Sequence, residues 1–412
     1  MVVVYASNDG YARHLGVSLY SLYARNRKVE DVRVFVLSMG IGADSADKLR
    51  EVAEGFGREL RFVEVGDPGA RVLRSTDASS AVGGASPPMS CRRLRMLGST
   101  DAAGTGSDAR QTVSDAADEA DETVAPSETA APGSVDADVP DPGKAGLQAA
   151  KTDAGTEGID TGGFDPSILG RFFIGSLLPD DVERVLYLDC DTVVCRGLEA
   201  LWGMDLKGLI LGAVEEPTIY PAVRSSLGLG RTAPYFNSGV LLIDLKRWRE
   251  EDIERKLLSF FRDAAGGLFA GDQDAINGVL KGRIRPLLPT YNFFSNYYYF
   301  PYSELVRLSP GYGSVGKKRF LQAKRRPAIL HFCGDERPWV AGNKNPYRRL
   351  YTRNLKKTPW RGTPPETGKE AYMAAYHGMN LVTRICPPAR RVVSRLFGMR
   401  VVKGRKKGSG NN

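Results

Sequence analysis

The sequence has no hydrophobic run near the ~18 residues that a transmembrane helix needs. Its first residues, Met1-Val-Val-Val-Tyr-Ala, have a strand-like pattern and none of the features of a secretory leader. Cysteine is scarce, and the five cysteines are scattered, without the spacing of a metal site. We therefore expect a cytoplasmic protein whose thiols are reduced.

Aromatic residues are missing from 63 to 163, where Ala, Gly, Ser, Thr, Asp and Pro predominate. Such a composition buries too little apolar area to offset the entropy lost on ordering, so we predict a disordered insertion at 74–162. Residues 101–160 hold 14 acidic and 3 basic residues, a net charge of −11, while the whole chain carries +9. The remainder is therefore at +20, which suits an anionic partner. No platform of interleaved aromatic and basic residues supports nucleic-acid binding, and we expect none.

Acidic residues are absent after Glu370. In 390–407, apolar residues at helical spacing are flanked by arginines and lysines, the pattern of a helix that lies on an anionic membrane surface. A solvated tail, or one packed against the domain, is the alternative. We predict a basic, partly helical tail over 346–412. Through this tail the protein would contact the inner face of the membrane peripherally.

Short hydrophobic runs alternate with helical patterns through the rest of the chain. Strands are expected at 2–6, 32–37, 60–65, 185–188, 209–214, 235–244 and 327–332. Helices are expected after 11, at 45–56, at 166–178, from 245 and at 271–277. This alternation predicts an α/β domain with a largely parallel sheet.

The stretch 184–194 ends a buried strand with two aspartates, Asp189 and Asp191. Side chains at the carboxyl end of such a strand face the crevice where ligands bind. Two carboxylates repel each other unless a cation lies between them, and oxygen ligands suit Mg²⁺ or Mn²⁺. The alternative is a strand-to-turn junction in which Asp191 and Thr192 bond the local backbone.

Six motifs stand in an order that resembles the retaining glycosyltransferases of family 8, the group of bacterial lipooligosaccharide galactosyltransferases and glycogenin. They are Ala6-Ser-Asn-Asp-Gly-Tyr11, Arg171 upstream of Leu-Leu-Pro, Val-Leu-Tyr-Leu-Asp-Cys-Asp, Phe-Asn-Ser-Gly-Val-Leu-Leu-Ile-Asp, Asp272-Gln273-Asp274 and His331-Phe-Cys-Gly-Asp-Glu-Arg-Pro-Trp339. The resemblance covers about 1–72 and 164–345. It implies a Rossmann-like GT-A domain over 1–345, a mixed, mostly parallel sheet flanked by helices and interrupted by the insertion 74–162.

The resemblance also implies residue roles around a UDP-hexose donor. Asp189, Asp191 and His331 would bind Mn²⁺, with Mg²⁺ as the alternative, and the ion would stabilise departing UDP. The residues for substrate binding would be Ala6, Asn8, Tyr11, Asn237, Ser238, Gly334 and Arg337, and the catalytic residues Arg171, Asp272 and Gln273. Three positions depart from the family pattern, and one of them is Gly10, which offers no side chain to the ribose where some relatives have Asn. Arg337 stands where Lys is usual, and Asn8 stands where Asp is frequent.

The function implied is transfer of glucose or galactose from UDP to a glycan, lipid-linked or protein acceptor, with retained configuration, in the synthesis of cell-envelope polysaccharide or glycoconjugate. Since the amide of Gln273 is a poor nucleophile, a same-face reaction and a covalent intermediate both remain open. One alternative is a non-catalytic UDP-sugar-binding or scaffold protein. Another is a sugar nucleotidyltransferase, which would want a Gly-rich basic phosphate loop that Ser7-Asn-Asp-Gly lacks.

Overall fold

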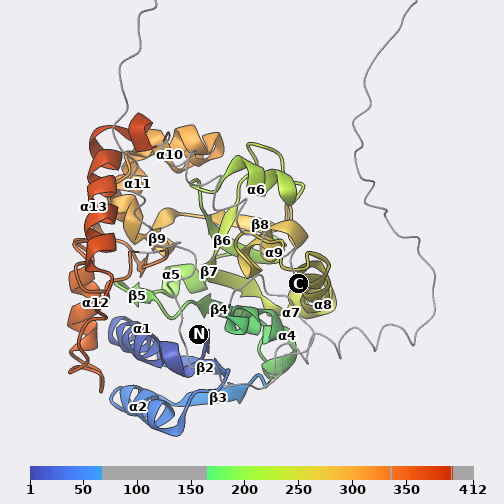
Figure 1. Ribbon diagram of the computed structural model, residues 1–412. Helices are drawn as coiled ribbons and strands as arrows, with labels where there is room; N and C mark the ends of the chain where they lie inside the picture. The colour runs from blue at the N-terminus through green and yellow to red at the C-terminus, as the bar shows by residue number, and fades with distance from the viewer. Residues whose placement is uncertain (67–164, 335, 391, 393–412) are drawn as a thin grey trace, which may run out of the picture. The chain divides into compact units, whose positions relative to one another are not determined.

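A seven-stranded sheet organises the part of the chain that the computed structural model describes, which is residues 1–66, 165–334, 336–390 and 392 (Figure 1). In spatial order the strands are β3 (Leu60–Glu64), β2 (Arg33–Ser38), β1 (Val2–Ser7), β4 (Arg184–Leu188), β7 (Phe236–Asp244), β6 (Leu211–Glu215) and β8 (Ile284–Leu287). Of these seven, β7 alone runs against the others. The predicted mixed, mostly parallel sheet is confirmed.

Alternating side chains of the central strands pack into two separate cores. Along β1, Val3 and Tyr5 join one core, while Val2 and Val4 join the other. The first core also takes buried residues of α1 (Ala12–Arg25), α2 (Ala43–Glu54), α5 (Glu199–Trp202), α10 (Tyr302–Leu308), α11 (Lys317–Arg325), α12 (Arg348–Leu355) and α13 (Glu370–Ile385). The second takes those of η2 (Pro166–Phe173), α4 (Ile174–Leu177), α7 (Leu245–Glu250), α8 (Ile253–Asp263) and α9 (Asp272–Val279). Helices therefore cover both faces of the sheet, as predicted.

A second, three-stranded sheet lies beside the first and consists of β5 (Thr192–Val194), β10 (Ile329–His331) and β9 (Phe293–Phe294). β10 runs antiparallel to β5 and parallel to β9. The pairing places His331 opposite Thr192, directly after the second aspartate of the acidic motif. The remaining short helices are η1 (Asp9–Tyr11), α6 (Pro221–Ser226), η3 (Pro289–Tyr291), η4 (Ser295–Tyr298) and η5 (Pro310–Val315).

The helix expected at 166–178 is a 3₁₀ helix, η2, followed by the single turn of α4. Glycine lowers the propensity of a segment for α-helix, and this one contains Gly170 and Gly175. A Cβ on Gly170 would lie 2.9 Å from Met39 Cε, and one on Gly175 would lie 3.0 Å from Trp248 Cδ1. The two glycines therefore permit close packing against neighbouring side chains and lower the α-helical propensity of the segment.

The predicted insertion at 74–162 lies outside the described residues, as does nearly all of the amphipathic segment at 390–407. Within the described part, α12 and α13 pack against the domain, with Tyr351 and Met373 buried in the first core. The division of the chain at residue 345 stays a prediction. Among the described residues, no helix is both long and apolar enough to cross a membrane.

Glu336 is a buried carboxylate held between the loop after β10 and helix α13. Its exposed fraction is 0%. Asn380 Nδ2 donates to Glu336 Oε1 at 3.3 Å, His377 Nδ1 lies 3.7 Å from the same oxygen, and Oε2 has no partner among the described residues. Burial raises the pKa of Glu336 to about 7, with Asn345 opposing the shift. The folded protein therefore binds this proton more tightly than the unfolded chain does.

We expect the wild type to lose stability as pH rises, and we expect Glu336→Gln to abolish this dependence on pH. A carboxyl with a pKa of about 7 in the fold and 4.5 unfolded stabilises the protein below pH 4.5, and this contribution is lost as pH rises through 7. The difference amounts to roughly 3 kcal/mol. Urea unfolding of both proteins between pH 4.5 and 8 measures it, with Glu51→Gln, an exposed position, as the control. A wild-type-minus-variant difference that is constant with pH contradicts the prediction.

Candidate active site

The register of two sheets brings the acidic pair and His331 together. Asp189 follows β4, and because β7 is antiparallel to β4, the start of β7 lies beside it, with Asp189 N donating to Gly239 O at 2.8 Å. β10 ends beside the start of β5, where Phe332 N donates to Asp191 O at 3.0 Å. Residues far apart in the sequence thus meet at the edge where β4 ends.

One ligand atom each from Asp189, Asp191 and His331 lies within 4.8 Å of the other two. His331 Nε2 is 3.1 Å from Asp191 Oδ1 and 3.8 Å from Asp189 Oδ2. The second oxygen of each carboxylate accepts a hydrogen bond from an arginine. Arg171 Nη2 donates to Asp189 Oδ1 at 2.9 Å, and Arg337 Nη1 donates to Asp191 Oδ2 at 2.5 Å. One oxygen of each aspartate is left facing the histidine.

A chain of hydrogen bonds indicates which nitrogen of His331 can bind a metal. The backbone N–H of Gly239 donates to Asn237 Oδ1 at 2.9 Å, and Asn292 Nδ2 donates to the same oxygen at 2.8 Å. The remaining amide atom of Asn292, Oδ1, is therefore an acceptor, and it lies 3.0 Å from His331 Nδ1. Nδ1 carries the proton, and Nε2 offers its lone pair toward the carboxylates. Histidine ligands of metals are usually held in this way.

The charges around this cluster favour ionised aspartate. Although burial opposes ionisation, the nearby His331 and Arg337 outweigh it and lower the pKa of Asp191 to about 2. Burial also works against a protonated His331, yet Asp191 keeps the pKa of the imidazole above its ordinary value. A divalent cation could replace the proton between imidazole and carboxylates. Two carboxylate oxygens and one imidazole nitrogen fit Mn²⁺ or Mg²⁺.

Gly239 has no side chain, and the candidate metal ligands occupy the space that a side chain would fill. A Cβ at this position would lie 2.3 Å from His331 Cε1 and 2.6 Å from Asp189 Oδ2, closer than van der Waals contact allows. The strand can therefore carry no side chain here without moving the two candidate ligands. We expect this glycine to be required for metal binding.

Gly239→Ala is predicted to weaken Mn²⁺ binding by roughly 10–100-fold, since displaced ligands lose their geometry. Isothermal titration with Mn²⁺ measures the change, and thermal unfolding without metal shows whether the variant still folds. Gly378→Ala is the matched control, because no atom of the described residues lies within 4 Å of a Cβ at that exposed position in α13. Equal Mn²⁺ affinity in a folded Gly239→Ala protein would argue against the cluster as the metal site.

Arg171 links the candidate metal ligands to a second acid, Asp272, at the start of α9. Arg171 is 8% exposed. Its Nη1 lies 3.0 Å from Asp272 Oδ2 and donates to Ser238 Oγ at 2.8 Å and Ser238 O at 2.9 Å. Its Cζ also lies 4.7 Å from the centre of the Tyr187 ring. Burial raises the pKa of Asp272 to about 6, against the opposing effect of Arg171. One arginine therefore pairs with two carboxylates, the buried Asp272 and the half-buried Asp189.

Gln273 is held at all of its polar atoms. Its Oε1 accepts from Ser238 N at 3.1 Å and Asn237 Nδ2 at 2.8 Å. Its Nε2 donates to Glu216 Oε2 at 3.2 Å and lies 3.1 Å from the hydroxyl oxygen of Tyr235. Because a backbone N–H can only donate, the bond from Ser238 fixes the orientation of the amide.

The sequence-based prediction did not include Glu216 or Tyr235. Glu216 accepts from both Gln273 and Asn237, and burial raises its pKa, partly offset by these hydrogen bonds. A signal for Glu216 was present, because it follows β6, a buried strand parallel to β4, and so lies at the same edge as Asp189. The same argument that selects the aspartates applies to it.

The residues expected around the nucleotide also gather near the end of β1 and the loop after β10. Ala6 O accepts from Cys190 Sγ at 3.3 Å, and the Tyr11 ring packs edge-on against His14, with centroids 5.5 Å apart. Arg337 lies over the Trp339 ring at 5.4 Å. Gly334 has a φ of +74°, which favours glycine.

The Asn8 side chain has local partners. Its Oδ1 accepts from Tyr11 N at 3.2 Å and so caps η1, while its Nδ2 donates to Asp165 Oδ2 at 3.1 Å. This is the turn-forming role that asparagine often has. A contact with a base would need this amide to give up at least one of these bonds, and the role in nucleotide binding stays a prediction.

Comparisons with known proteins agree with this architecture. Residues 162–342 match the model of glycosyl transferase family 8. General stress protein A of Bacillus subtilis is 23% identical over 363 residues, 87% of this chain and 94% of that protein. Lipopolysaccharide 1,2-glucosyltransferase of Escherichia coli is 31% identical over 202 residues, 48% of this chain and 56% of that protein. The crystal structure of galactosyltransferase LgtC with donor and acceptor sugar analogues superimposes with a TM-score of 0.55 at 20% identity, covering 88% of this chain and 99% of LgtC.

The fold is therefore that of the GT-A glycosyltransferases, with an acidic pair and a histidine where the central strand ends. The chain carries a domain of glycosyl transferase family 8.

Proposed function

We propose that the protein is a metal-dependent, retaining hexosyltransferase that moves glucose or galactose from UDP to a glycan, lipid-linked or protein acceptor. The observation that carries this proposal is the cluster of Asp189, Asp191 and His331, in which Nε2 of the imidazole faces two free carboxylate oxygens. The names of two similar proteins, a lipopolysaccharide glucosyltransferase and a galactosyltransferase, support a role in cell-envelope glycan synthesis.

The metal would be Mn²⁺, with Mg²⁺ as the alternative, because imidazole beside carboxylates suits Mn²⁺ better than an all-oxygen site would. When bound, the ion supplies Lewis-acid stabilisation of the departing diphosphate. Arg337 donates one N–H to Asp191 and would bring a permanent positive charge to the phosphates. Gly334 has a positive φ, and no described atom lies within 4 Å of a Cβ placed on it, so its backbone could come close to them.

The donor sugar would lie against Arg171, Asn237, Ser238, Asp272 and Gln273, which form one hydrogen-bonded network at the start of β7 and α9. Asp272 would accept from sugar hydroxyls. The reaction breaks the bond between the anomeric carbon and the UDP oxygen and forms one to the acceptor oxygen, whose proton passes to the leaving phosphate.

The hydrogen bonds of Gln273 favour the same-face route to retention. Two donors, Ser238 N and Asn237 Nδ2, already use its Oε1. To act as a nucleophile, this oxygen would lose those bonds in a buried site, where an unpaired polar group costs roughly 1–3 kcal/mol. We infer that Gln273 positions groups around the anomeric carbon and forms no bond to it.

UDP release from UDP-glucose and UDP-galactose, with Mn²⁺ or EDTA and no added acceptor, tests the proposal. Metal-dependent release of UDP by slow hydrolysis is the expected result, and the faster donor identifies the hexose. If no release occurs, binding of each donor is measured by titration calorimetry. Binding without release favours the alternative of a non-catalytic UDP-sugar-binding protein. Absence of binding overturns the proposed donor.

A further inference from the structure

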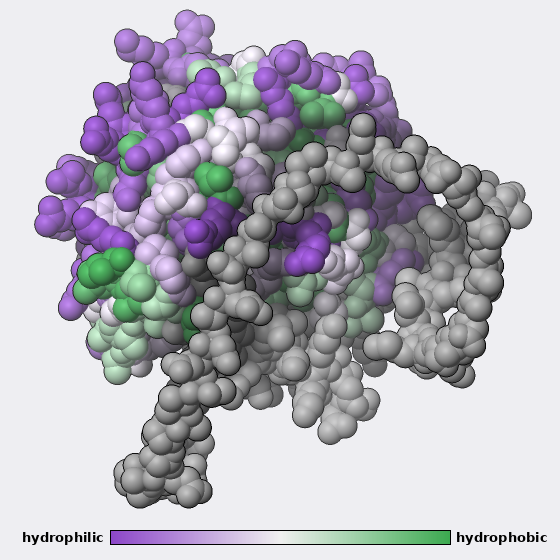
Figure 2. All heavy atoms as spheres, turned by 90° about the horizontal axis from the view of Figure 1, so that it is seen from above, coloured by the Kyte–Doolittle hydropathy of each residue, from purple (hydrophilic) through white to green (hydrophobic). Residues whose placement is uncertain are grey.

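A hollow rich in arginine lies between the segment after β5, the residues before and in η3, and helix α11. Its volume is about 290 Å³. Four arginines line it, Arg196, Arg319, Arg325 and Arg326, together with the polar side chains of Thr290 and Gln322. Figure 1 shows α11 toward one end of the molecule, and Figure 2, which looks down on that end, shows a largely hydrophilic surface at its upper left.

The positive charge of this hollow has no counter-charge in the described part of the protein. No aspartate or glutamate lines it. The side chains of Arg319, Arg325 and Arg326 make no hydrogen bond or ion pair with any described residue, and Arg196 bonds only neutral oxygens, donating to Thr290 Oγ1 at 2.7 Å and Pro327 O at 3.4 Å. Guanidinium groups gathered in this way repel each other, and a bound anion would relieve that repulsion.

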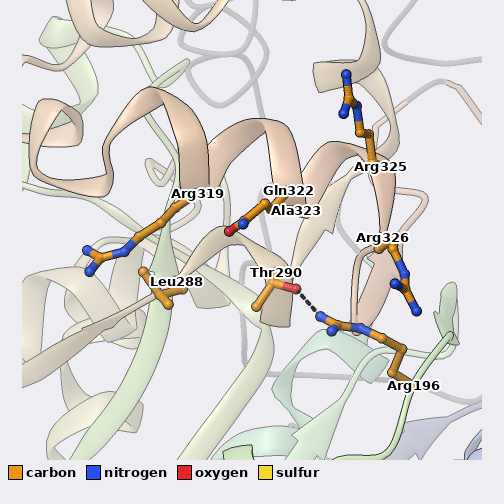
Figure 3. Close-up of a pocket in the computed structure, with 8 residues that line it drawn as sticks. All are labelled: Arg196, Leu288, Thr290, Arg319, Gln322, Ala323, Arg325 and Arg326. Atoms are coloured by element: carbon orange, nitrogen blue, oxygen red, sulfur yellow. Dashed lines mark hydrogen bonds between the residues drawn. The ribbon is translucent and has the colours of Figure 1, made fainter.

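The directions of the side chains single out two of the arginines. In Figure 3, Arg326 extends toward Arg196, whose guanidinium is held in place by its bond to Thr290. Arg319 extends to the opposite side, toward Leu288, and Arg325 points away from the other three. Arg196 and Arg326 are thus placed to act on one ligand from two different segments of the chain.

We propose that this hollow binds a phosphate group through Arg196 and Arg326. Guanidinium presents N–H donors in a planar fork that matches two phosphate oxygens, and it keeps its charge at every physiological pH. Thr290 and Gln322 add neutral donors at the wall. Leu288, which is 39% exposed, gives the rim an apolar edge beside the charges, which suits a phosphate that carries an organic chain.

This site is separate from the candidate active site. β5 runs from Thr192, next to the acidic pair, to Val194, two residues before Arg196, and β10 runs back from the hollow to His331. The two sites therefore lie at opposite ends of β5 and β10, which have three residues each and span about 10 Å. The proposal does not depend on the proposed transferase activity, because none of its residues belongs to the donor site.

Two sources could supply the phosphate, a free phosphorylated molecule and the headgroup of an anionic lipid. Hydrogen exchange read by peptide distinguishes the hollow from the diphosphate site. Hydrogen exchange of the full chain is measured in EDTA in three conditions. The chain is mixed with inorganic pyrophosphate, with vesicles of phosphatidylcholine and phosphatidylglycerol, or with vesicles of phosphatidylcholine alone. Protection of residues 288–290 and 317–326 is the expected result. Protection by pyrophosphate identifies a free phosphate as sufficient, and protection by the anionic vesicles alone identifies a headgroup.

The variant Arg196→Gln/Arg326→Gln should raise the ligand concentration for half-maximal protection by more than about tenfold, since each charged hydrogen bond contributes about that factor. The matched control is Arg325→Gln/Arg353→Gln, which removes the same total charge. Arg325 points away from the other arginines of the hollow, and Arg353, in α12, does not line it. Its half-maximal concentration should change less than about threefold, which is the scale of a surface-charge effect. An equal loss in both variants means general attraction to a basic surface and overturns the proposal, as does the absence of protection by either ligand.

Discussion

Asp191→Asn is expected to lower Mn²⁺-dependent UDP release by about a thousandfold or more. The substitution keeps the size of the side chain but removes the charge that faces His331 Nε2 at 3.1 Å. Lewis-acid stabilisation of a leaving group is worth several kcal/mol, and each 1.4 kcal/mol is a factor of ten in rate. The loss should appear with either donor sugar, because the proposed metal would act on the diphosphate that both donors share.

The control for this variant is Asp47→Asn, which removes the same charge from an exposed ion pair with Arg50. Release by the control should match the wild type. Calorimetric titration of each protein with Mn²⁺ shows whether lost activity follows lost metal. A folded Asp191→Asn protein that keeps Mn²⁺-dependent release would mean that the metal acts elsewhere, and the assignment of all three ligands would fail with it.

The acidic pair could be predicted from sequence because the argument is local. A short apolar run predicts the strand, and the residues that follow it lie at the ligand-binding edge. His331 could not be predicted from a local pattern, because its place beside Asp191 depends on antiparallel pairing of β10 with β5. No periodicity within either segment specifies that register. Resemblance to a family supplied the residue, and the structure supplied its position.

Other features escaped prediction because they arise only from contacts across the chain. Asn292, in an aromatic-rich segment, orients His331, yet nothing near it in the sequence suggests a site. The reversed direction of β7 brings Asn237 and Ser238 to the end of β4, and an apolar run does not encode direction. The close approach of Gly170 in η2 to Met39 likewise depends on a residue far away in the sequence. Each of these features can be predicted only when the neighbouring segment and its position are known.

Arg171→Ala is expected to reduce stability by roughly 3–5 kcal/mol and to abolish UDP release. The guanidinium pairs with Asp189 at 2.9 Å and with Asp272 at 3.0 Å, and its removal leaves the buried Asp272 and the half-buried Asp189 uncompensated. Arg171→Lys keeps the charge, but an ammonium lacks the planar fork that reaches Asp189, Asp272 and Ser238 at once. The lysine variant should therefore fold with a smaller loss of stability and still lose most of its activity.

Because the cost of Arg171→Ala comes from unpaired charge, it should shrink when that charge is removed. The pKa of Asp272 is already raised to about 6 and would rise further without its arginine. Protonation below pH 6 would then relieve the penalty, so the stability difference from wild type should be smaller at pH 5 than at pH 8. Adding Asp272→Asn should relieve it at both values, and urea unfolding of the four proteins of this double-mutant cycle measures the coupling. A penalty that is the same at both pH values and additive in the cycle would show that Arg171 stabilises the fold by packing, for example against Tyr187, rather than by joining the two acids.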